Sequence, residues 1–267
     1  MAQNAVKPTL EEHLDYLEKV VQLKLFFLHY YLETHPEESF RDVLRRRVDI
    51  YRKTALNEIH GLCPEPNFED PRWQKMEDAA EAIYLRTKDD RAAFEREAFE
   101  VFRESLRERA PLDYEVCWTP QERPFGTIIP EQALQPDGKT LSIHIANDIA
   151  PRSPFEDPDY IPGCLEKVVA YAEKLHAEYI SCSSWLNDHP LWCRNFPPSW
   201  LENMSEPEPQ IEWHFGFWGQ FISSRKTFNE KYGARMRATC QFPYRLRNTR
   251  CTLAELKSFL ADRKKQS

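Results

Sequence analysis

The sequence predicts an α/β protein, α+β overall, with an N-terminal helical bundle followed by a mixed, partly parallel β-sheet that is flanked by helices. Through the first 110 residues, apolar side chains recur at the three- and four-residue spacing of amphipathic helices. Beyond residue 110, prolines become frequent and short runs of strand-forming residues appear. We therefore divide the chain into a helical domain, 1–110, and an α/β domain, 111–267, that carries the candidate site.

Four helices with short connections account for the N-terminal domain. Thr9 and Glu12 form a capping-box pattern at the start of the first helix, and Pro71 suits the first turn of the third. The histidines of this region lack the one-turn spacing of paired metal ligands, and the seven cysteines are widely spaced, so we expect reduced thiols and no metal site. The expected helices cover about 10–34, 40–56, 70–84 and 94–106.

Two segments of the second half end in the same dipeptide, Asn-Asp. Residues 141–146 and 179–184 are strand formers, and the segment between them has helical spacing. A strand, a crossover helix and a second strand require parallel pairing. Both Asn-Asp ends are then expected at one edge of the sheet, the edge where open α/β sheets bind ligands.

Further elements complete this domain. Short strands are expected near 114–118 and 126–129, and Gly138 suits the turn that precedes the strand at 140. The alternation of aromatic and polar residues predicts a third main strand at 212–218. The chain is expected to close with helices near 225–239 and 253–263.

The expected sheet edge brings together polar side chains that are suited to acid–base chemistry. His144 is the best-placed general base, with Asp148 as its orienter or as an anchor for a substrate amine. Asn147 and Asn187 would position the substrate, and Arg152 would hold an anionic group with its planar guanidinium. The alternative for His144 is a buried, hydrogen-bonded place in the core.

Other residues are candidates for catalysis or for a ligand pocket. Cys182, on the strand beside that of His144, is a candidate nucleophile, with an inert buried thiol as the alternative. His214, on the third expected strand, is the second candidate base. The crowded tryptophans, among them Trp185 and Trp218, either fill the core or line a pocket for a ring, an acyl chain or a cofactor.

The second expected strand reads Ile180-Ser181-Cys182-Ser183-Ser184-Trp185-Leu186-Asn187-Asp188. This stretch, together with a helical half before an α/β half, resembles the two-part bacterial proteins that carry a helical domain and a C-terminal GNAT-like acyltransferase domain. The resemblance covers about 141–188 and implies a GNAT-like fold, with acetyl-CoA or another acyl-CoA as the cofactor. The glycine-rich turn that holds the pyrophosphate of acetyl-CoA in that superfamily has no counterpart among the 7 glycines of this chain, so the cofactor stays open.

Composition narrows the range of partners. The longest apolar run, 25–28, is far shorter than a membrane span, and the N-terminus has no signal-peptide core, so we expect a cytoplasmic protein without a membrane partner. The net charge is −7, with an acidic middle region, 111–224, and a basic C-terminal segment, 225–267. This division favours a C-terminal segment that packs back on the domain over one that binds nucleic acid.

Together these patterns predict a soluble enzyme that acts on a small molecule in biosynthesis or secondary metabolism. Its acid–base chemistry would take place at the carboxyl ends of the parallel strands, with a transferase, acting on acyl or amino groups, as the leading class. One alternative is a non-catalytic protein that binds a small molecule or peptide in a tryptophan-rich groove. Another is an interaction protein whose basic C-terminal segment meets an acidic partner. The oligomeric state stays open.

Overall fold

The computed structural model describes residues 7–58, 66–118, 122–208 and 215–266. These residues form two compact units, each built from segments that are far apart in the sequence. The helical unit comprises 7–58, 66–118 and 215–243, and the sheet unit comprises 122–208 and 244–266. The units therefore differ from the expected division at residue 110, because 215–243 groups with the helices.

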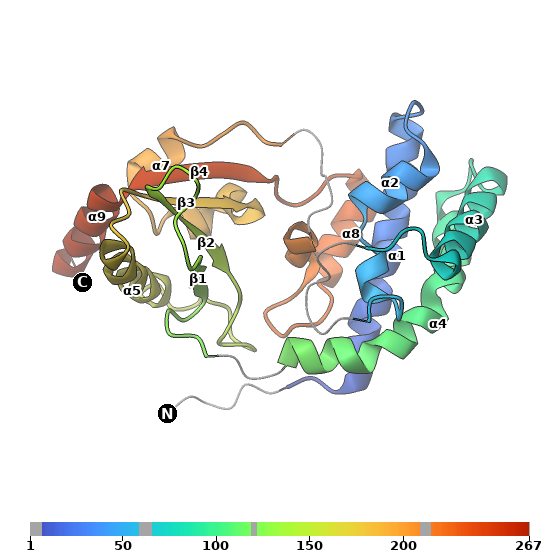
Figure 1. Cartoon of the computed structure of the whole chain (residues 1–267), viewed down its shortest axis with the longest axis horizontal. Helices are drawn as coiled ribbons and strands as arrows, with labels where there is room; N and C mark the ends of the chain where they lie inside the picture. The colour runs from blue at the N-terminus through green and yellow to red at the C-terminus, as the bar shows by residue number, and fades with distance from the viewer. Residues whose placement is uncertain (1–6, 59–65, 119–121, 209–214, 267) are drawn as a thin grey trace. The chain divides into compact units, whose positions relative to one another are not determined.

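Helices build the described part of the helical unit (Figure 1). Its elements are α1 (Leu10–Thr34), α2 (Phe40–Arg47), η1 (Tyr51–Lys53), α3 (Pro71–Arg86), α4 (Arg91–Trp118), η3 (Phe215–Phe221) and α8 (Glu230–Thr239). The capping box of Thr9 and Glu12 starts α1 as predicted, and α1 packs against α4. The predicted N-terminal bundle is confirmed by α1 to α4.

Two predictions for this part of the chain are wrong. The second helix was expected to reach residue 56, but α2 ends at Arg47, and the chain turns at Asp49, which has a positive φ of 46°. The segment 114–118 was expected as a strand, but it belongs to α4, which continues through Pro111. Packing explains this continuation, since Ala110 and Asp113 on either side of the proline are both buried in the unit.

Aromatic side chains dominate the core of the helical unit. Trp73, Phe94 and Phe102 are completely buried there, and Trp218 and Phe221 of η3 share the same core. The described part of the expected strand 212–218 is thus a 3₁₀-helix, and 212–214 lie outside the described residues. A 3₁₀-helix aligns side chains three residues apart, which brings Trp218 and Phe221 to the same core.

The sheet unit contains a four-stranded mixed sheet in the order β1-β2-β3-β4. Its strands are β1 (Ile128–Pro130), β2 (Thr140–Ile145), β3 (Tyr179–Ser184) and β4 (Arg247–Thr252). β2 and β3 are parallel, as predicted, and α5 (Tyr160–Lys174) connects them, whereas the two outer strands pair antiparallel. The Gly138 turn before β2 is also confirmed, with a φ of +68°.

β4 was not expected from the sequence. It alternates buried Thr249 and Cys251 with exposed Asn248 and Arg250, so only one small apolar residue marks its inner side. The remaining helices of the unit are α6 (Pro190–Cys193), α7 (Pro198–Glu202) and α9 (Leu253–Gln266), and η2 (Trp185–Asp188) follows β3. Figure 1 shows α5 and α9 beside one another on one side of the sheet.

The two faces of the sheet differ in chemistry. Leu141, Ile143, Ile180 and Cys182 point into the core that the sheet shares with α5 and α9. The opposite face carries polar side chains that are exposed or half-buried, and we call it the polar face. It consists of Ser142, His144, Ser181, Ser183, Asn248 and Arg250. A sheet with one face packed and one face polar is typical of α+β domains.

The basic C-terminal helix packs on the acidic part of the same unit. Leu256 and Leu260 of α9 are buried in the core of the sheet unit. Lys264 forms an ion pair of 2.8 Å with Glu166 of α5, and a further pair joins α9 to the same helix. The predicted packing of the basic segment on its own domain is therefore confirmed for α9.

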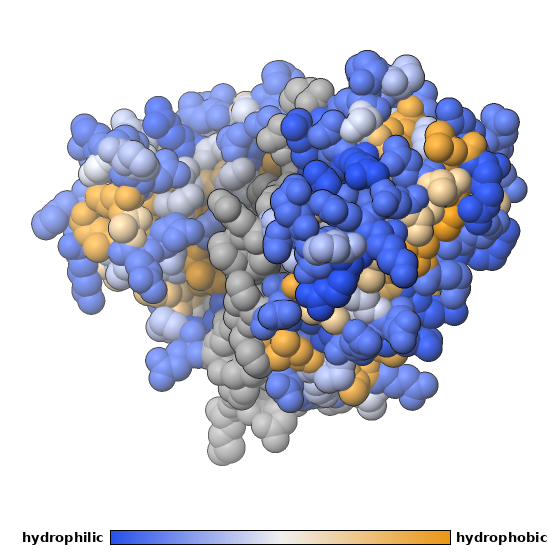
Figure 2. Space-filling model, turned by 45° about the vertical axis from the view of Figure 1, so that its right-hand side comes forward, coloured by the Kyte–Doolittle hydropathy of each residue, from blue (hydrophilic) through white to orange (hydrophobic). Residues whose placement is uncertain are grey.

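Polar side chains cover most of the surface that Figure 2 shows for the described residues. On the face shown in Figure 2, the coloured surface is mostly hydrophilic, and its apolar side chains lie in several separate groups. Across the four described ranges, no helix combines the length and the apolar character that crossing a bilayer would require.

Candidate functional site

The carboxyl ends of β2 and β3 do lie at one edge of the sheet, but the polar residues there mainly hold their own loops. Asn147 donates from Nδ2 to the carbonyl oxygen of Arg152 (2.9 Å) and accepts from the N–H of Ile149 (3.1 Å). Asp148 accepts from the hydroxyl of Tyr160 at 2.6 Å. These three hydrogen bonds stabilise the loop that leads into α5.

Asn187 is a buried structural residue. Its Nδ2 donates to the carbonyl oxygens of Cys182 (2.9 Å) and Arg247 (2.8 Å), and its Oδ1 accepts from the indole N–H of Trp192 (3.1 Å). Asp188 beside it accepts from Arg247 at 3.0 Å. These bonds attach the end of β3 to β4. The Asn187 side chain is buried and makes its hydrogen bonds within the sheet unit.

His144 and Cys182 lie on opposite faces of the sheet. The register pairs Ser142 with Ser181, and the alternation along each strand then puts His144 and Ser183 on the polar face and Cys182 on the buried face. Burial raises the pKa of the Cys182 thiol to about 12. The expectation that Cys182 acts as a nucleophile beside His144 is therefore wrong, and the buried-thiol alternative holds.

His144 has a carboxylate partner that the sequence did not indicate. Its Nε2 lies 2.6 Å from Oε1 of Glu131, and both side chains are 53% exposed. Glu131 directly follows β1, in which Ile129 pairs with His144. The core alternative for His144 does not hold, because the imidazole faces outward from the polar face.

Side chains with hydrogen-bonding groups surround this pair. Gln135 lies with its Nε2 3.4 Å from Oγ of Ser142 and 3.3 Å from Oγ of Ser181, so it bridges β2 and β3. Across the sheet, the Arg250 guanidinium lies 4.7 Å from the centre of the Tyr179 ring. The polar face thus combines hydroxyl, amide and guanidinium groups with a histidine–carboxylate pair.

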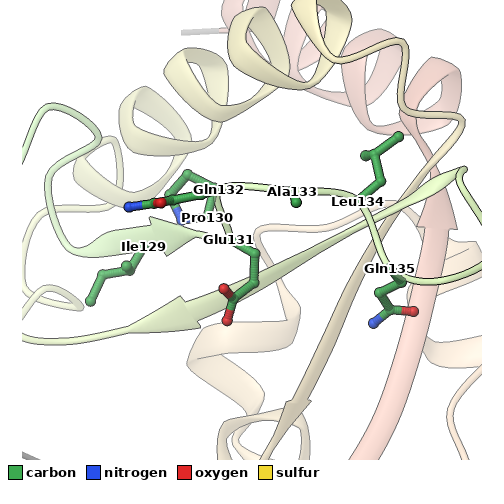
Figure 3. A pocket seen from close by; sticks show the side chains of 7 residues that line it. All are labelled: Ile129, Pro130, Glu131, Gln132, Ala133, Leu134 and Gln135. Atoms are coloured by element: carbon green, nitrogen blue, oxygen red, sulfur yellow. The ribbon is translucent and has the colours of Figure 1, made fainter.

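A hollow of ≈ 530 Å³ lies along the end of β1 and the segment that follows it. It is open to solvent and is lined by the segment from Ile129 to Gln135, which includes Glu131. Figure 3 shows the side chains of Glu131 and Gln135 on the same side of this segment. The hollow is therefore lined by Glu131, the partner of His144, and by Gln135, whose amide lies near Ser142 and Ser181.

His189 is a second histidine at the strand edge, and the sequence analysis missed it. Its ring stacks on Phe155 at 5.0 Å and lies 4.7 Å from the ring of Tyr244, which in turn stacks on Trp185 at 5.7 Å. Burial lowers the pKa of His189, which favours the neutral imidazole. Its position directly after the second Asn-Asp was the available signal.

Three of the tryptophans that the sequence analysis assigned to a core or a pocket fill a core. Trp192 and Trp200 are completely buried in the core of the sheet unit. Trp218 is 3% exposed and belongs to the core of the helical unit. Core filling accounts for these residues, and His214 lies outside the described part of the chain.

A separate cluster of ionisable side chains lies within the helical unit. His13 on α1 is 2.9 Å from Oδ2 of Asp113 on α4, and Lys53 on η1 is 2.7 Å from Oδ1 of the same carboxylate. The thiol of Cys117 donates to Oδ2 of Asp113 at 3.7 Å. The side chains of His13 and Asp113 are only 3% and 8% exposed. We call these four residues the Asp113 cluster.

Burial and charge determine how the Asp113 cluster titrates. Burial alone would raise the pKa of Asp113, but the Lys53 ammonium and the His13 hydrogen bond hold this pKa well below its usual range. Cys117 is an exposed residue, but its thiol points to Asp113, and the partial removal of this sulfur from water, with the negative charge of Asp113, raises the pKa of the thiol to about 11. Nearby, burial lowers the pKa of Lys24 to about 8, while its ammonium donates to the carbonyl oxygen of Asp49.

The sequence analysis missed this cluster because it assigned 114–118 to a strand. In α4, Asp113 and Cys117 are four residues apart and share one helix face, and His13 reaches them from α1. The three ligand-type atoms of His13, Asp113 and Cys117 all lie within 4.8 Å of one another. These residues are the ones in the described chain that could together hold a metal ion.

Comparisons of the chain with protein families, with curated proteins and with solved structures found no match in any of the three. The geometry of the polar face and of the Asp113 cluster therefore carries the functional argument.

Proposed function

We propose that the sheet unit is an acid–base enzyme that acts on a polar small molecule bound over the polar face, with His144 as the general base. The observation that supports this proposal is the 2.6 Å pair of His144 and Glu131, in which Glu131 also lines a hollow of ≈ 530 Å³. Glu131 is the positioning partner of the histidine.

The pair has the elements that general-base catalysis needs. A carboxylate that accepts from Nε2–H leaves Nδ1 as the basic nitrogen and stabilises the imidazolium after proton uptake. Glu131 is itself anchored, because its backbone N–H donates to the carbonyl oxygen of Ser142 at 2.9 Å. The imidazole is exposed, so a substrate can reach it without a change in the fold.

The surrounding groups favour a substrate with hydroxyl, amine or anionic groups. Ser142, Ser181 and Gln135 offer hydrogen bonds, and Arg250 on the same face offers a positive charge. Proton removal from a substrate amine or hydroxyl by His144 would create a nucleophile for acyl transfer or for related amino-group chemistry. Acetyl-CoA is thus one co-substrate to test.

The test follows the consumption of defined compounds by mass spectrometry. The full chain is incubated with amines, amino acids and hydroxy acids, each with and without acetyl-CoA. We expect turnover of at least one compound, and a loss of roughly two to four orders of magnitude in kcat for His144→Gln. Glu131→Gln should lose less, because the base itself is retained.

Two matched variants serve as controls. His35→Gln changes a histidine of the helical unit, and Glu178→Gln changes an exposed carboxylate that pairs with Lys139. Both should retain wild-type turnover. Wild-type turnover by a folded His144→Gln variant would overturn the proposal, and binding of a compound without any turnover would favour the non-catalytic binding protein instead.

A further inference from the structure

We propose that His13, Asp113 and Cys117 of the helical unit bind a divalent cation of the zinc class. This site is independent of the proposed function, which uses residues of the sheet unit only. The three side chains supply one nitrogen, one oxygen and one sulfur ligand, the donor set that zinc accepts in proteins.

The spacing of the donor atoms is close to that of a tetrahedral site. A zinc ion at about 2.0 Å from nitrogen and oxygen and about 2.3 Å from sulfur separates its ligand atoms by roughly 3.3–3.5 Å. The observed separations are 2.9 Å from His13 to Asp113 and 3.7 Å from Cys117 to Asp113. The remaining pair is within 4.8 Å, which a rotation of the Cys117 side chain can shorten.

The two oxygens of Asp113 have different partners. Oδ2 faces His13 and Cys117, the two other ligands, whereas Oδ1 accepts from Lys53 at 2.7 Å. A ligating carboxylate whose second oxygen is hydrogen-bonded is the usual second-shell arrangement of metal sites. Lys53 thereby holds the carboxylate in place without occupying the oxygen that would bind the ion.

The charge and exposure of the cluster point to the kind of ion. Ca²⁺ and Mg²⁺ need several oxygen ligands, and this cluster offers a single carboxylate, so these hard cations fit it poorly. An imidazole, a thiolate and a carboxylate suit a zinc-class ion, and the thiolate and carboxylate balance its two charges and leave the single charge of Lys53. His13 and Asp113 are buried, but Cys117 is exposed, which leaves an entry route and a fourth position for water.

The simplest alternative is a structural ion network that ties α1, η1 and α4 together. That network needs Asp113, His13 and Lys53, but it does not need the sulfur of Cys117. Cys117→Ser therefore separates the two accounts. Because Cys117 is exposed, this variant keeps the packed side of α4 intact.

The experiment uses the full chain without a histidine tag, freed of metal by a chelator. It is titrated with Zn²⁺ against a chromogenic chelator and with Co²⁺ under absorption spectroscopy. We expect one ion per chain, a thiolate-to-cobalt charge-transfer band, and a melting temperature that rises with Zn²⁺. Cys117→Ser should abolish the band and weaken Zn²⁺ binding by roughly 100-fold or more, beyond the effect of a second-shell change.

Two further variants complete the test. His13→Gln should weaken Zn²⁺ binding as Cys117→Ser does, and Cys240→Ser, a thiol control on the end of α8, should bind like the wild type. Absence of Zn²⁺ and Co²⁺ binding by the wild type would overturn the proposal. So would binding that survives Cys117→Ser unchanged, because the ion would then lie elsewhere in the chain.

Discussion

Each unit of this protein contains a histidine–carboxylate pair of similar length, yet the two pairs differ in burial. On the polar face, His144 and Glu131 are 2.6 Å apart and both 53% exposed. In the helical unit, His13 and Asp113 are 2.9 Å apart and 3% and 8% exposed. Distance alone would rank the pairs as equals. Burial separates them, because removing one partner of a buried charge pair leaves an uncompensated charge.

The comparison indicates which pair is free to serve a reaction. An exposed ion pair contributes about 0–1 kcal/mol to stability, so the pair on the polar face can change without consequence for the fold. The Asp113 cluster is part of the packing of α1, η1 and α4. Variants of the two pairs should therefore affect different measurements: those of the His144–Glu131 pair the proposed activity, and those of the Asp113 cluster the free energy of unfolding.

Asp113→Asn gives the largest expected effect. The substitution leaves the Lys53 ammonium buried without its counter-charge, and it should lower the free energy of unfolding by about 3–5 kcal/mol. Urea unfolding at pH 7 measures this loss. Asp15→Asn, which changes an exposed pair with Lys19 on α1, is the control and should lower the unfolding free energy by less than about 0.5 kcal/mol.

The same variant has a defined pH dependence. The folded-state pKa of Asp113 is depressed, so its stabilising contribution is complete above the unfolded pKa near 4 and is lost as pH falls towards the folded value. The stability difference between wild type and Asp113→Asn should thus be constant at neutral pH and shrink below about pH 4. A difference that does not shrink in acid would contradict the assignment of the charge.

Lys24→Met tests the second buried charge of the helical unit. Burial lowers the pKa of Lys24 from 10.5 to about 8 in the folded protein. Between these two pH values Lys24 is less protonated in the folded state than in the unfolded state. The wild type should therefore gain stability relative to Lys24→Met across this range, by at most about 3 kcal/mol. Urea unfolding at several pH values measures the gain, and parallel curves for the two proteins would refute it.

Asn187→Ala tests whether the end of β3 is structural. The change removes the partner of the buried Cys182 carbonyl oxygen, of the partly buried Arg247 carbonyl oxygen and of the buried Trp192 indole N–H, which should cost about 2 kcal/mol. Thermal or urea unfolding measures this loss, with the exposed Asn203→Ala as control. Unchanged stability would return Asn187 to the list of candidate substrate-binding residues.

Glu131→Gln gives the smallest expected effect on stability. Both partners of this pair are half exposed, so the unfolding free energy should change by less than about 1 kcal/mol. The informative measurement is the ratio of this change to that of Asp113→Asn in the same buffer. Equal losses in the two variants would break the contrast between the two pairs.

The elements that the sequence predicted correctly have strong local signals. The capping box at Thr9 predicts the start of α1, and the run of strand formers at 179–184 matches β3 residue for residue. The elements that the sequence analysis predicted wrongly or missed have weak or misleading local signals. Pro111 suggested an end to α4, and the polar alternation of β4 concealed a strand whose inner side carries only Thr249 and Cys251.

The candidate site was predicted in part. His144 was identified correctly as a residue on a parallel strand, but its partner Glu131 depends on the antiparallel register of β1 and β2. Cys182 was expected beside His144. The register of β2 and β3 instead puts its neighbours Ser181 and Ser183 on the face of His144, and Cys182 on the other face. A shift of one residue decides which side chains meet, and no local pattern specifies it.

The sequence by itself determined the N-terminal helices, the parallel pairing of β2 and β3, and the packing of the basic α9 on its own unit. These features depend on periodicity, capping and charge, which act between residues that are close in the chain or along a whole element. Only the tertiary structure decided that His13 meets Asp113 one hundred residues later, and that η3 joins the helical unit. Such contacts form when distant segments pack against one another. The free energy of this packing depends on many side chains together and on no local sequence pattern.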